Sequence, residues 1–341
     1  MTVLSFEDEP QLGSENPFEF RWKSREFQRH PLAPYLRILT AERFLRRDPV
    51  ELVHARSDLP GLAALLGRHL PFVWDMRSFW REQRIELGTI RAGSATDRVL
   101  QRLESRLAEK AAGIICLSES ARRVLEARYG DEVSSKCLIV PTTVDTDRFK
   151  PSPPSRIDHK YILLSGTYNG FYDSEAIVLF IEKFRSRLYH PIRWTGATDT
   201  SPLWNHVSNL PDVYFERVPF DAMPEIVGGA IFGLSVCHSH NMAPLAAAVP
   251  TKIAEFLSSG RPVVVNAGLG DMNEILEKYR CGVVLEGRDE AAIERGVTEM
   301  IELLEDPELS RRARDCALAE FDLDQGVAKI SQLYESIAAS R

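Results

Sequence analysis

Short apolar runs alternate with amphipathic segments of helical length along nearly the whole chain, and this alternation restricts the fold more than any other feature. Many of the runs are continuous and rich in Val and Ile, which is typical of parallel strands buried on both faces. The runs predict strands at 2–5, 51–55, 71–74, 113–117, 137–140, 161–165, 191–194, 212–215, 231–236, 262–265 and 282–285. The segments between them predict helices near 59–68, 97–112, 119–128, 173–187, 221–228, 251–259, 271–279, 288–304, 308–319 and 325–338. This order predicts doubly wound α/β layers in which the carboxyl ends of the strands share one side.

The chain is longer than a usual single domain. Its 341 residues predict two domains. The alternation breaks at 141–156, where four prolines in PTTVDTDRFKPSPPSR stiffen the chain and prevent a helix. We therefore predict one domain over 1–153 and a second domain that begins at 154.

Composition narrows the class of protein. Hydrophobic residues make up 44% and charged residues 27%, as in ordinary globular proteins. No apolar run is long enough to span a bilayer, and Glu7, Asp8 and Glu9 interrupt the stretch that a signal peptide would need. Five cysteines without a CxxC pair predict reduced thiols of a cytoplasmic protein. The net charge of −7 argues against nucleic acid as a partner.

The acidic total hides a basic segment at residues 21–47. Eight Lys and Arg residues stand there against only Glu26 and Glu42, with aromatic residues between them. A segment of this kind can make a peripheral contact with an anionic membrane surface, here the inner face of the membrane. The alternative is an amphipathic helical pair that packs on the first sheet.

Residues 250–271, PTKIAEFLSSGRPVVVNAGLGD, carry the most specific local signals. The amphipathic helix over 251–259 is expected to end at Gly260, which can adopt the left-handed C-cap conformation. A buried strand, a glycine turn and another helix follow, and Asp271 is expected to cap that helix. Glu255 interrupts an apolar helix face that would line the ligand crevice of an α/β protein. The alternative for Glu255 is a solvated helix carboxylate.

This segment resembles the nucleotide-sugar site of retaining glycosyltransferases of family 4, which have the two-domain GT-B architecture. A subgroup of the family carries P-T-K-x-x-E-[FY]-L-x-x-G-x-P-V-V followed by N-x-G-x-G-D. Two further matches to that subgroup lie upstream. The second match is the pair VHARSDLPGLAALL at 53–66 and PFVWDMRSFWREQR at 71–84, and the third is the linker IVPTTVDTDRFKP at 139–151. The three matches occur in the order that the family has.

The resemblance implies two Rossmann-like doubly wound domains that face a cleft. Residues 1–153 would form the acceptor-side domain, 154–322 the nucleotide-sugar domain, and 323–341 a helix that crosses back to the first domain. In the family, the glutamate at the Glu255 position binds the donor ribose. The strand, glycine loop and helix start at 161–173 also predict an anion site from the residues alone, because backbone amides and the helix dipole would face a phosphate. The predicted donor-binding residues are Glu255, Gly166, Thr167, Thr251, Pro250 and Val218.

The chain departs from the family pattern around the diphosphate. Thr167 replaces the usual arginine after the glycine, and an uncharged Tyr-Asn-Gly-Phe-Tyr loop replaces the usual lysine. Lys252, one helical turn before Glu255, is expected to supply the missing charge, and Arg261 is a second candidate with less support. Ala247 stands where many members have a second glutamate. The small residues at 243–249 would allow close approach of the backbone to a sugar or phosphate, and the alternative is a flexible apolar loop.

Three residues are predicted to act in catalysis: Arg77, Lys252 and His54. Arg77 holds a position where the family often has a histidine, and it can donate hydrogen bonds to the donor sugar but cannot carry protons. His54 ends a predicted strand, which favours a place at the cleft, although a histidine packed within the sheet is the alternative. No metal is expected, because the family is metal-independent and His238 and His240 have no third ligand nearby.

We therefore predict a retaining, hexosyltransferase-like glycosyltransferase that moves a sugar from a nucleoside-diphosphate sugar to an acceptor hydroxyl without a cofactor. The acceptor would be a carbohydrate or a lipid-linked molecule, in polysaccharide or glycolipid synthesis. The alternatives are a catalytically weak or inactive GT-B-like partner protein and, with less support, a nucleotide-sugar epimerase. Family members usually begin with a strand and glycine-rich loop ahead of the stretch that MTVLSF resembles. A shortened first domain is therefore also expected. It would give either weak or absent transferase activity with nucleotide binding retained, or a site completed by a partner chain or a second copy.

Overall fold

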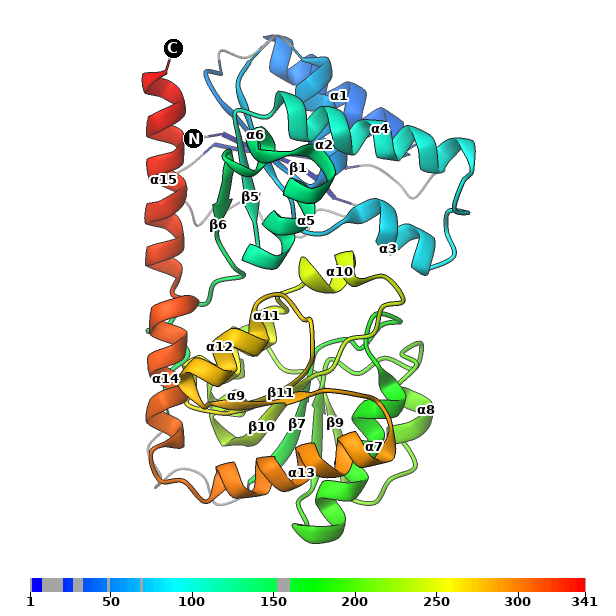
Figure 1. Cartoon of the computed structure of the whole chain (residues 1–341), viewed down its shortest axis with the longest axis vertical. Helices are drawn as coiled ribbons and strands as arrows, with labels where there is room; N and C mark the ends of the chain where they lie inside the picture. Colours follow the sequence, from blue (N-terminus) through cyan, green and yellow to red (C-terminus); the bar gives the residue numbers. More distant parts are fainter. Residues whose placement is uncertain are drawn as a thin grey trace.

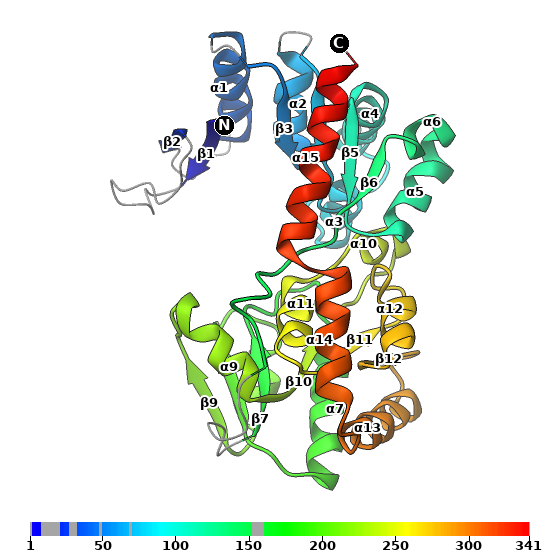
Figure 2. The same cartoon turned by 90° about the vertical axis from the view of Figure 1, so that its left-hand side faces the viewer.

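The chain forms two α/β units stacked end to end, and the C-terminal helix runs alongside the first unit (Figures 1 and 2). The computed structural model describes residues 2–7, 21–26, 33–47, 50–67, 70–151 and 160–340. The predicted domain limit at 153/154 lies outside these residues, so the domain limits stay a prediction. Both large sheets are parallel, as the continuous apolar runs predict.

The first unit contains a four-stranded sheet in the order β3-β4-β5-β6. Its strands are β3 (Val53–Arg56), β4 (Phe72–Asp75), β5 (Gly113–Cys116) and β6 (Cys137–Ile139). Its helices are α2 (Asp58–Leu66), α3 (Trp80–Glu86), α4 (Ala95–Lys110), α5 (Glu119–Tyr129) and α6 (Asp131–Ser134). Trp74 and Ile114 pack with α2, α4 and α5, whereas Val73 and Ile115 face the other way and pack with α15 (Leu323–Ala339). The C-terminal helix thus covers the second face of this sheet.

The second unit contains a six-stranded sheet in the order β12-β11-β10-β7-β8-β9. Its strands are β7 (Tyr161–Ser165), β8 (Ile192–Thr195), β9 (Val213–Glu216), β10 (Ala230–Ser235), β11 (Val263–Asn266) and β12 (Gly282–Leu285). The chain adds strands outward in both directions from the central β7–β10 pair. The topological switch point therefore lies between β7 and β10, where ligands of open α/β sheets bind.

Helices cover both faces of the second sheet. They are α7 (Ser174–Arg187), α8 (Trp204–Val207), η2 (Phe220–Ala222), α9 (Met223–Gly229), α10 (Met242–Ala246), α11 (Thr251–Ser258), α12 (Met272–Tyr279), α13 (Glu290–Leu304) and α14 (Leu309–Glu320). Leu163 and Val263 pack with α9, α11 and α12, while Ile162 and Val264 pack with α7 and α13. This division follows from side chains that alternate between the faces of a strand.

Every predicted strand and helix is present, with its ends within two residues of the prediction. The segment 21–47 differs from the helical pair considered for it. Its first part is strand β2 (Arg21–Glu26), which pairs in parallel with β1 (Thr2–Glu7) in a separate sheet, and only α1 (Ala33–Arg47) is helical. None of the helices in the described ranges is long and apolar enough to cross a membrane.

Two local predictions near the end of the second sheet are wrong. Asp271 precedes α12 but makes no side-chain capping bond to that helix; its carboxylate instead accepts hydrogen bonds from the start of α5 in the first unit. The segment 243–249 is not a loop throughout, because residues 242–246 form α10. Ala243 and Ala247 are buried in the first unit's apolar core, which supplies the contacts that make this short helix stable.

Candidate functional site

The loop that follows β7 is held close to its neighbour by two glycines. Gly166 has a φ of +80°, its amide donates to the carbonyl of Thr195 at 2.9 Å, and its carbonyl accepts from Trp194 Nε1 at 3.1 Å. A Cβ on Gly196 would lie 3.3 Å from the Gly166 Cα, so only glycine fits there without a shift. The amide of Gly166 therefore already has a hydrogen-bond acceptor within the protein, whereas the side chain of Thr167 is exposed.

Lys252 lies in the first turn of α11 and contacts this loop through two aromatic rings. Its Nζ is 3.7 Å from the centre of the Tyr168 ring and 4.2 Å from that of Tyr172. The side chain is buried, and Nζ forms no hydrogen bond within the described part of the chain. Burial lowers the pKa of Lys252 to about 7, against the opposing effects of Cys237 and Glu255. The ring faces stabilise the ammonium only in part, because a buried charge also needs hydrogen-bond acceptors.

Glu255 lies one helical turn further along α11. It is half-buried, and burial raises the pKa of its carboxyl while the Lys252 ammonium lowers it. Its carboxylate has no hydrogen bond to any residue that the structure describes. The loops after β7 and β10 meet beside this helix, where Tyr172 and Cys237 form an isolated β-bridge. Lys252 and Glu255 therefore stand together near the topological switch point.

Arg77 and His54 meet at Asp75, where strand β4 ends. Asp75 is buried, and its Oδ1 lies 3.5 Å from a guanidinium nitrogen of Arg77. His54 Nε2 lies 3.4 Å from Asp75 Oδ2, and its Nδ1 lies 2.6 Å from the hydroxyl of Tyr334 on α15. Burial lowers the pKa of Arg77, although Asp75 opposes the shift. His54 is thus bound on both ring nitrogens, as in the alternative of a histidine that packs within the fold, and its catalytic role stays a prediction.

The structure gathers the predicted residues into two groups. Around α11 lie Gly166, Thr167, Pro250, Thr251, Lys252 and Glu255, and around Asp75 lie Arg77 and His54. Within the described ranges, no hydrogen bond or ion pair joins the two groups directly. Val218 follows β9 and packs on the apolar core that contains Ile253 and Phe256 of α11. The assignment of these residues to catalysis and to donor binding stays a prediction.

Residues 1–148 match the family model described as Glycosyltransferase Family 4. The match covers the first unit, which is less than half of the 341 residues. The recognition of this family from the three sequence motifs is therefore confirmed. No curated protein matches the sequence.

Solved structures that this chain resembles share its architecture at low sequence identity. Sucrose-phosphate synthase from Thermosynechococcus elongatus is 15% identical with a TM-score of 0.74, over 100% of this chain and 89% of that one. HepE from Anabaena, in complex with UDP and glucose, is 14% identical with a TM-score of 0.64, over 94% and 86%. WaaG, a glycosyltransferase involved in lipopolysaccharide biosynthesis, is 15% identical with a TM-score of 0.65, over 92% and 86%. These likenesses confirm the predicted GT-B fold with two Rossmann-like domains.

Several residues of the site have no local sequence signal that predicts their role. Asp75 stands in the matched D-M-R motif, but the motif did not reveal that it holds both Arg77 and His54. Tyr168 and Tyr172 belong to the uncharged Tyr-Asn-Gly-Phe-Tyr loop after β7, and their rings contact Lys252. Tyr334 belongs to the apolar stripe of the last helix, so no local signal distinguishes it from a core residue.

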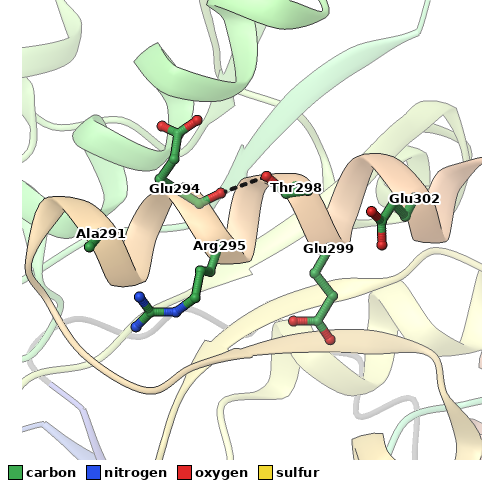
Figure 3. A pocket seen from close by; sticks show the side chains of 6 residues that line it. All are labelled: Ala291, Glu294, Arg295, Thr298, Glu299 and Glu302. Carbon is green, nitrogen blue, oxygen red and sulfur yellow. Dashed lines mark hydrogen bonds between the residues drawn. The ribbon is translucent and has the colours of Figure 1, made fainter.

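A cavity of about 450 Å³ lies elsewhere, along the outer side of α13. Figure 3 shows that its lining comes from this one helix. The lining residues are Ala291, Glu294, Arg295, Thr298, Glu299 and Glu302. Three of these side chains are carboxylates, which would repel a diphosphate. We therefore place the candidate site at the switch point and not in this cavity.

Proposed function

We propose that this protein transfers a sugar from a nucleoside-diphosphate sugar to an acceptor hydroxyl, with retention of the anomeric configuration. The observation that carries the proposal is that Lys252 and Glu255 stand one helical turn apart on α11 without an ion pair or hydrogen bond between them. A buried ammonium and a half-buried carboxylate stand there at the switch point, and neither has a hydrogen-bond partner among the described residues. These are the two kinds of group that a diphosphate and a ribose would satisfy. The family-model match over residues 1–148 and the GT-B fold support the same activity.

Each residue of the site has a defined part in the proposal. Glu255 accepts hydrogen bonds from the ribose hydroxyls of the donor, and Lys252 neutralises the diphosphate. Arg77 donates hydrogen bonds to the donor sugar from the first domain. In the reaction the bond between the anomeric carbon and the phosphate oxygen breaks, and its electron pair leaves with the diphosphate. The acceptor oxygen forms the new bond on the same face, and its proton passes to the oxygen of the departing diphosphate.

Stabilisation of the leaving group is the main contribution that these residues can make. Negative charge develops on the diphosphate as the bond to the sugar breaks, and a fixed cation in a site shielded from water favours that state. Lys252 can supply this cation, because its burial and the rings of Tyr168 and Tyr172 hold its side chain in place before the donor arrives. Burial lowers the pKa of Lys252 to about 7. Bound diphosphate in turn favours the charged form of its side chain.

The exposed face of α1 supports a lipid-linked acceptor. Tyr35, Leu36 and Leu39 are 66%, 46% and 48% exposed, while Ile38 and Leu45 anchor the opposite face of the helix. Arg43, Arg46 and Arg47 continue the exposed face toward the end of α1. A row of apolar groups followed by cations suits the surface of an anionic membrane. Sedimentation with anionic and neutral phospholipid vesicles tests this contact, and equal binding to both would contradict it.

All five cysteines have free thiols, which supports a cytoplasmic location. In that compartment the protein would meet nucleoside-diphosphate sugars.

The proposal is tested by ligand binding and turnover together. A thermal-shift screen across nucleoside diphosphates and nucleotide sugars identifies the donor, because a ligand at about 100 times Kd stabilises the fold by about 2.7 kcal/mol. Donor turnover is then measured with glycolipid and oligosaccharide acceptors, with and without cell extract. Stabilisation without any turnover would favour the inactive partner protein. Turnover only in the presence of extract would indicate a partner chain, and no stabilisation by any nucleotide would refute the proposal.

A further inference from the structure

The turn after β11 is packed against the segment that leads into α11. The amide of Gly270 donates to the carbonyl of Leu245 at 2.9 Å. Gly270 has a φ of +53°, and a Cβ there would lie 2.9 Å from the carbonyl oxygen of Ala248, so a side chain would push the two segments apart. Residues 245–248 run directly into α11, the helix of the proposed donor site. The turn and the donor helix are therefore held in one fixed relation.

The carboxylate of Asp271, at the end of this turn, crosses to the first domain. Its Oδ2 accepts from the amide of Glu119 at 2.6 Å, and its Oδ1 accepts from the amide and the hydroxyl of Ser120 at 2.9 and 2.8 Å. The N-cap residue Ser118 accepts from the amide of Ala121 at 3.0 Å. The first turn of α5 is thus satisfied partly by its own cap and partly by a carboxylate from the other domain. Amides at a helix start favour a negative charge, so Asp271 is well matched to this place.

Helix α5 is in turn fixed to the strand that carries Arg77. It follows β5, which pairs with β4, and the amide of Met76 donates to the carbonyl of Ile115 at 3.0 Å. A continuous path of hydrogen bonds and chain connections therefore runs from the Met76–Arg77 segment through β5 and α5 to the Asp271 carboxylate, and on to α11. This path connects the two groups of candidate residues, between which the described part of the chain has no direct hydrogen bond or ion pair.

A second contact between the domains lies beside the first. Glu86, at the end of α3, accepts from the amide of Asn241 at 3.0 Å and from the hydroxyl of Ser239. Ala243 and Ala247 pack into the first domain's apolar core. These contacts fasten the loop after β10, whereas the turn after β11 is fastened by Asp271.

We propose that Asp271 is a positioning residue for the transfer. By capping α5 from the opposite domain, its carboxylate sets the position of Arg77 relative to Lys252 and Glu255 on α11. The inference rests on the proposed function and assigns a role to the last residue of the N-x-G-x-G-D motif. The binding of the nucleotide alone does not need this contact, because Lys252 and Glu255 are both on the second domain. Removal of the contact should therefore lower turnover and leave nucleotide affinity in place.

The experiment compares Asp271→Ala and Asp271→Asn with Asp289→Ala in the full chain. Asp289 is a matched control, since its carboxylate caps its own helix α13 through the amide of Ala292 at 3.0 Å and faces no other domain. In Asp271→Ala we expect kcat to fall about tenfold to a hundredfold, because a small misplacement of reacting groups costs that much. Nucleotide Kd should stay within about twofold of the wild type. Asp271→Asn should retain an intermediate kcat, because asparagine is also a good N-cap.

Hydrogen exchange of the first turn of α5 gives a readout that does not depend on turnover. The amides of Glu119 and Ser120 should exchange about tenfold faster in Asp271→Ala and unchanged in Asp289→Ala. Unchanged exchange would overturn the contact, and faster exchange with a wild-type kcat would overturn the positioning role. A loss of nucleotide affinity equal to the loss of kcat would also overturn it. If the wild-type chain turns over no donor, the proposed function fails, while the exchange measurement still decides whether Asp271 fastens the domains.

Discussion

Two regions of the molecule bury charged side chains, and they do so in opposite ways. Behind the first sheet, Arg128 pairs with Glu82 and Glu104, each at 2.7 Å, and Arg81 pairs with Asp97 at 2.5 Å. At the switch point of the second sheet, the ammonium of the buried Lys252 lies against two aromatic rings and has no hydrogen bond or ion pair to a described residue. A buried charge is costly unless it is paired, and the charges of the first region are paired within the protein whereas the Lys252 ammonium is not. The difference separates a cluster that holds the fold together from a site that can bind a ligand.

The largest expected effect comes from breaking the paired region. Arg128→Met removes the cation that pairs with Glu82 and Glu104, whose side chains are 3% and 4% exposed. Two buried carboxylates would then lose a partner, and stability should fall by about 3–5 kcal/mol. Urea unfolding measures the loss, and nucleotide affinity of the folded fraction should not change. A variant with wild-type stability would remove the contrast between the two regions.

Glu255→Ala should lower nucleotide affinity and leave stability unchanged, the reverse of Arg128→Met. The loss of each hydrogen bond from the ribose should weaken nucleotide binding by roughly 1.5–3 kcal/mol. Stability should not fall, because burial raises the pKa of this carboxyl and no hydrogen bond to a described residue is lost. Isothermal titration with a nucleoside diphosphate measures the affinity.

Glu299→Ala is the matched control for that variant. Glu299 is also a helical glutamate whose pKa burial raises, but it lines the cavity on α13, as Figure 3 shows. Its removal should leave nucleotide affinity unchanged. Equal losses in the two variants would mean that Glu255 acts through helix stability and not through the ribose.

Lys252 should take up a proton when a diphosphate binds above neutral pH. Its pKa of about 7 means that the free site is mostly neutral at pH 8, while a bound diphosphate favours the charged form. Titrations at pH 8 in buffers of different ionisation enthalpy should report about one proton taken up per nucleotide. Lys252→Met should abolish the uptake and weaken diphosphate binding by about 1.5–3 kcal/mol, with a smaller loss for the nucleoside. No uptake by the wild type, or equal losses for both ligands, would show that Lys252 is structural.

The sequence predicts the local parts of this architecture well, because they depend on neighbours along the chain. Gly260 has the left-handed φ of +71° that its place after a helix predicts, and Lys252 and Glu255 share a helix as their spacing requires. The local pattern predicts that Asp271 caps the helix that follows it, whereas its observed partner Glu119 is 152 positions away in the sequence. His54 and Tyr334 meet across 280 positions. A local pattern identifies a carboxylate that suits a helix start, but only the packing of the two domains decides which helix it caps.

The smallest expected effect concerns Asp58, which lies close to the paired region but lacks a cation of its own. Its hydrogen bond from Trp74 Nε1 is 3.2 Å long, and burial, followed by the nearby Glu104, raises the pKa of its carboxyl to about 7. Because the folded-state pKa lies above the unfolded value of 3.8, the contribution of this group to stability is complete below that value. The contribution is lost as the pH rises through about 7. Asp58→Asn cannot ionise, so between pH 6 and pH 8 it should gain on the order of 1 kcal/mol relative to the wild type. Asp97→Asn is the control, since the Gly93 amide and then Arg81 lower the pKa of Asp97. Its effect on the free energy of unfolding should therefore be constant over the same pH window. Urea unfolding at several pH values measures both variants. If Asp58→Asn differs from the wild type by the same free energy at every pH, Asp58 is ionised in the folded protein and belongs with the paired charges.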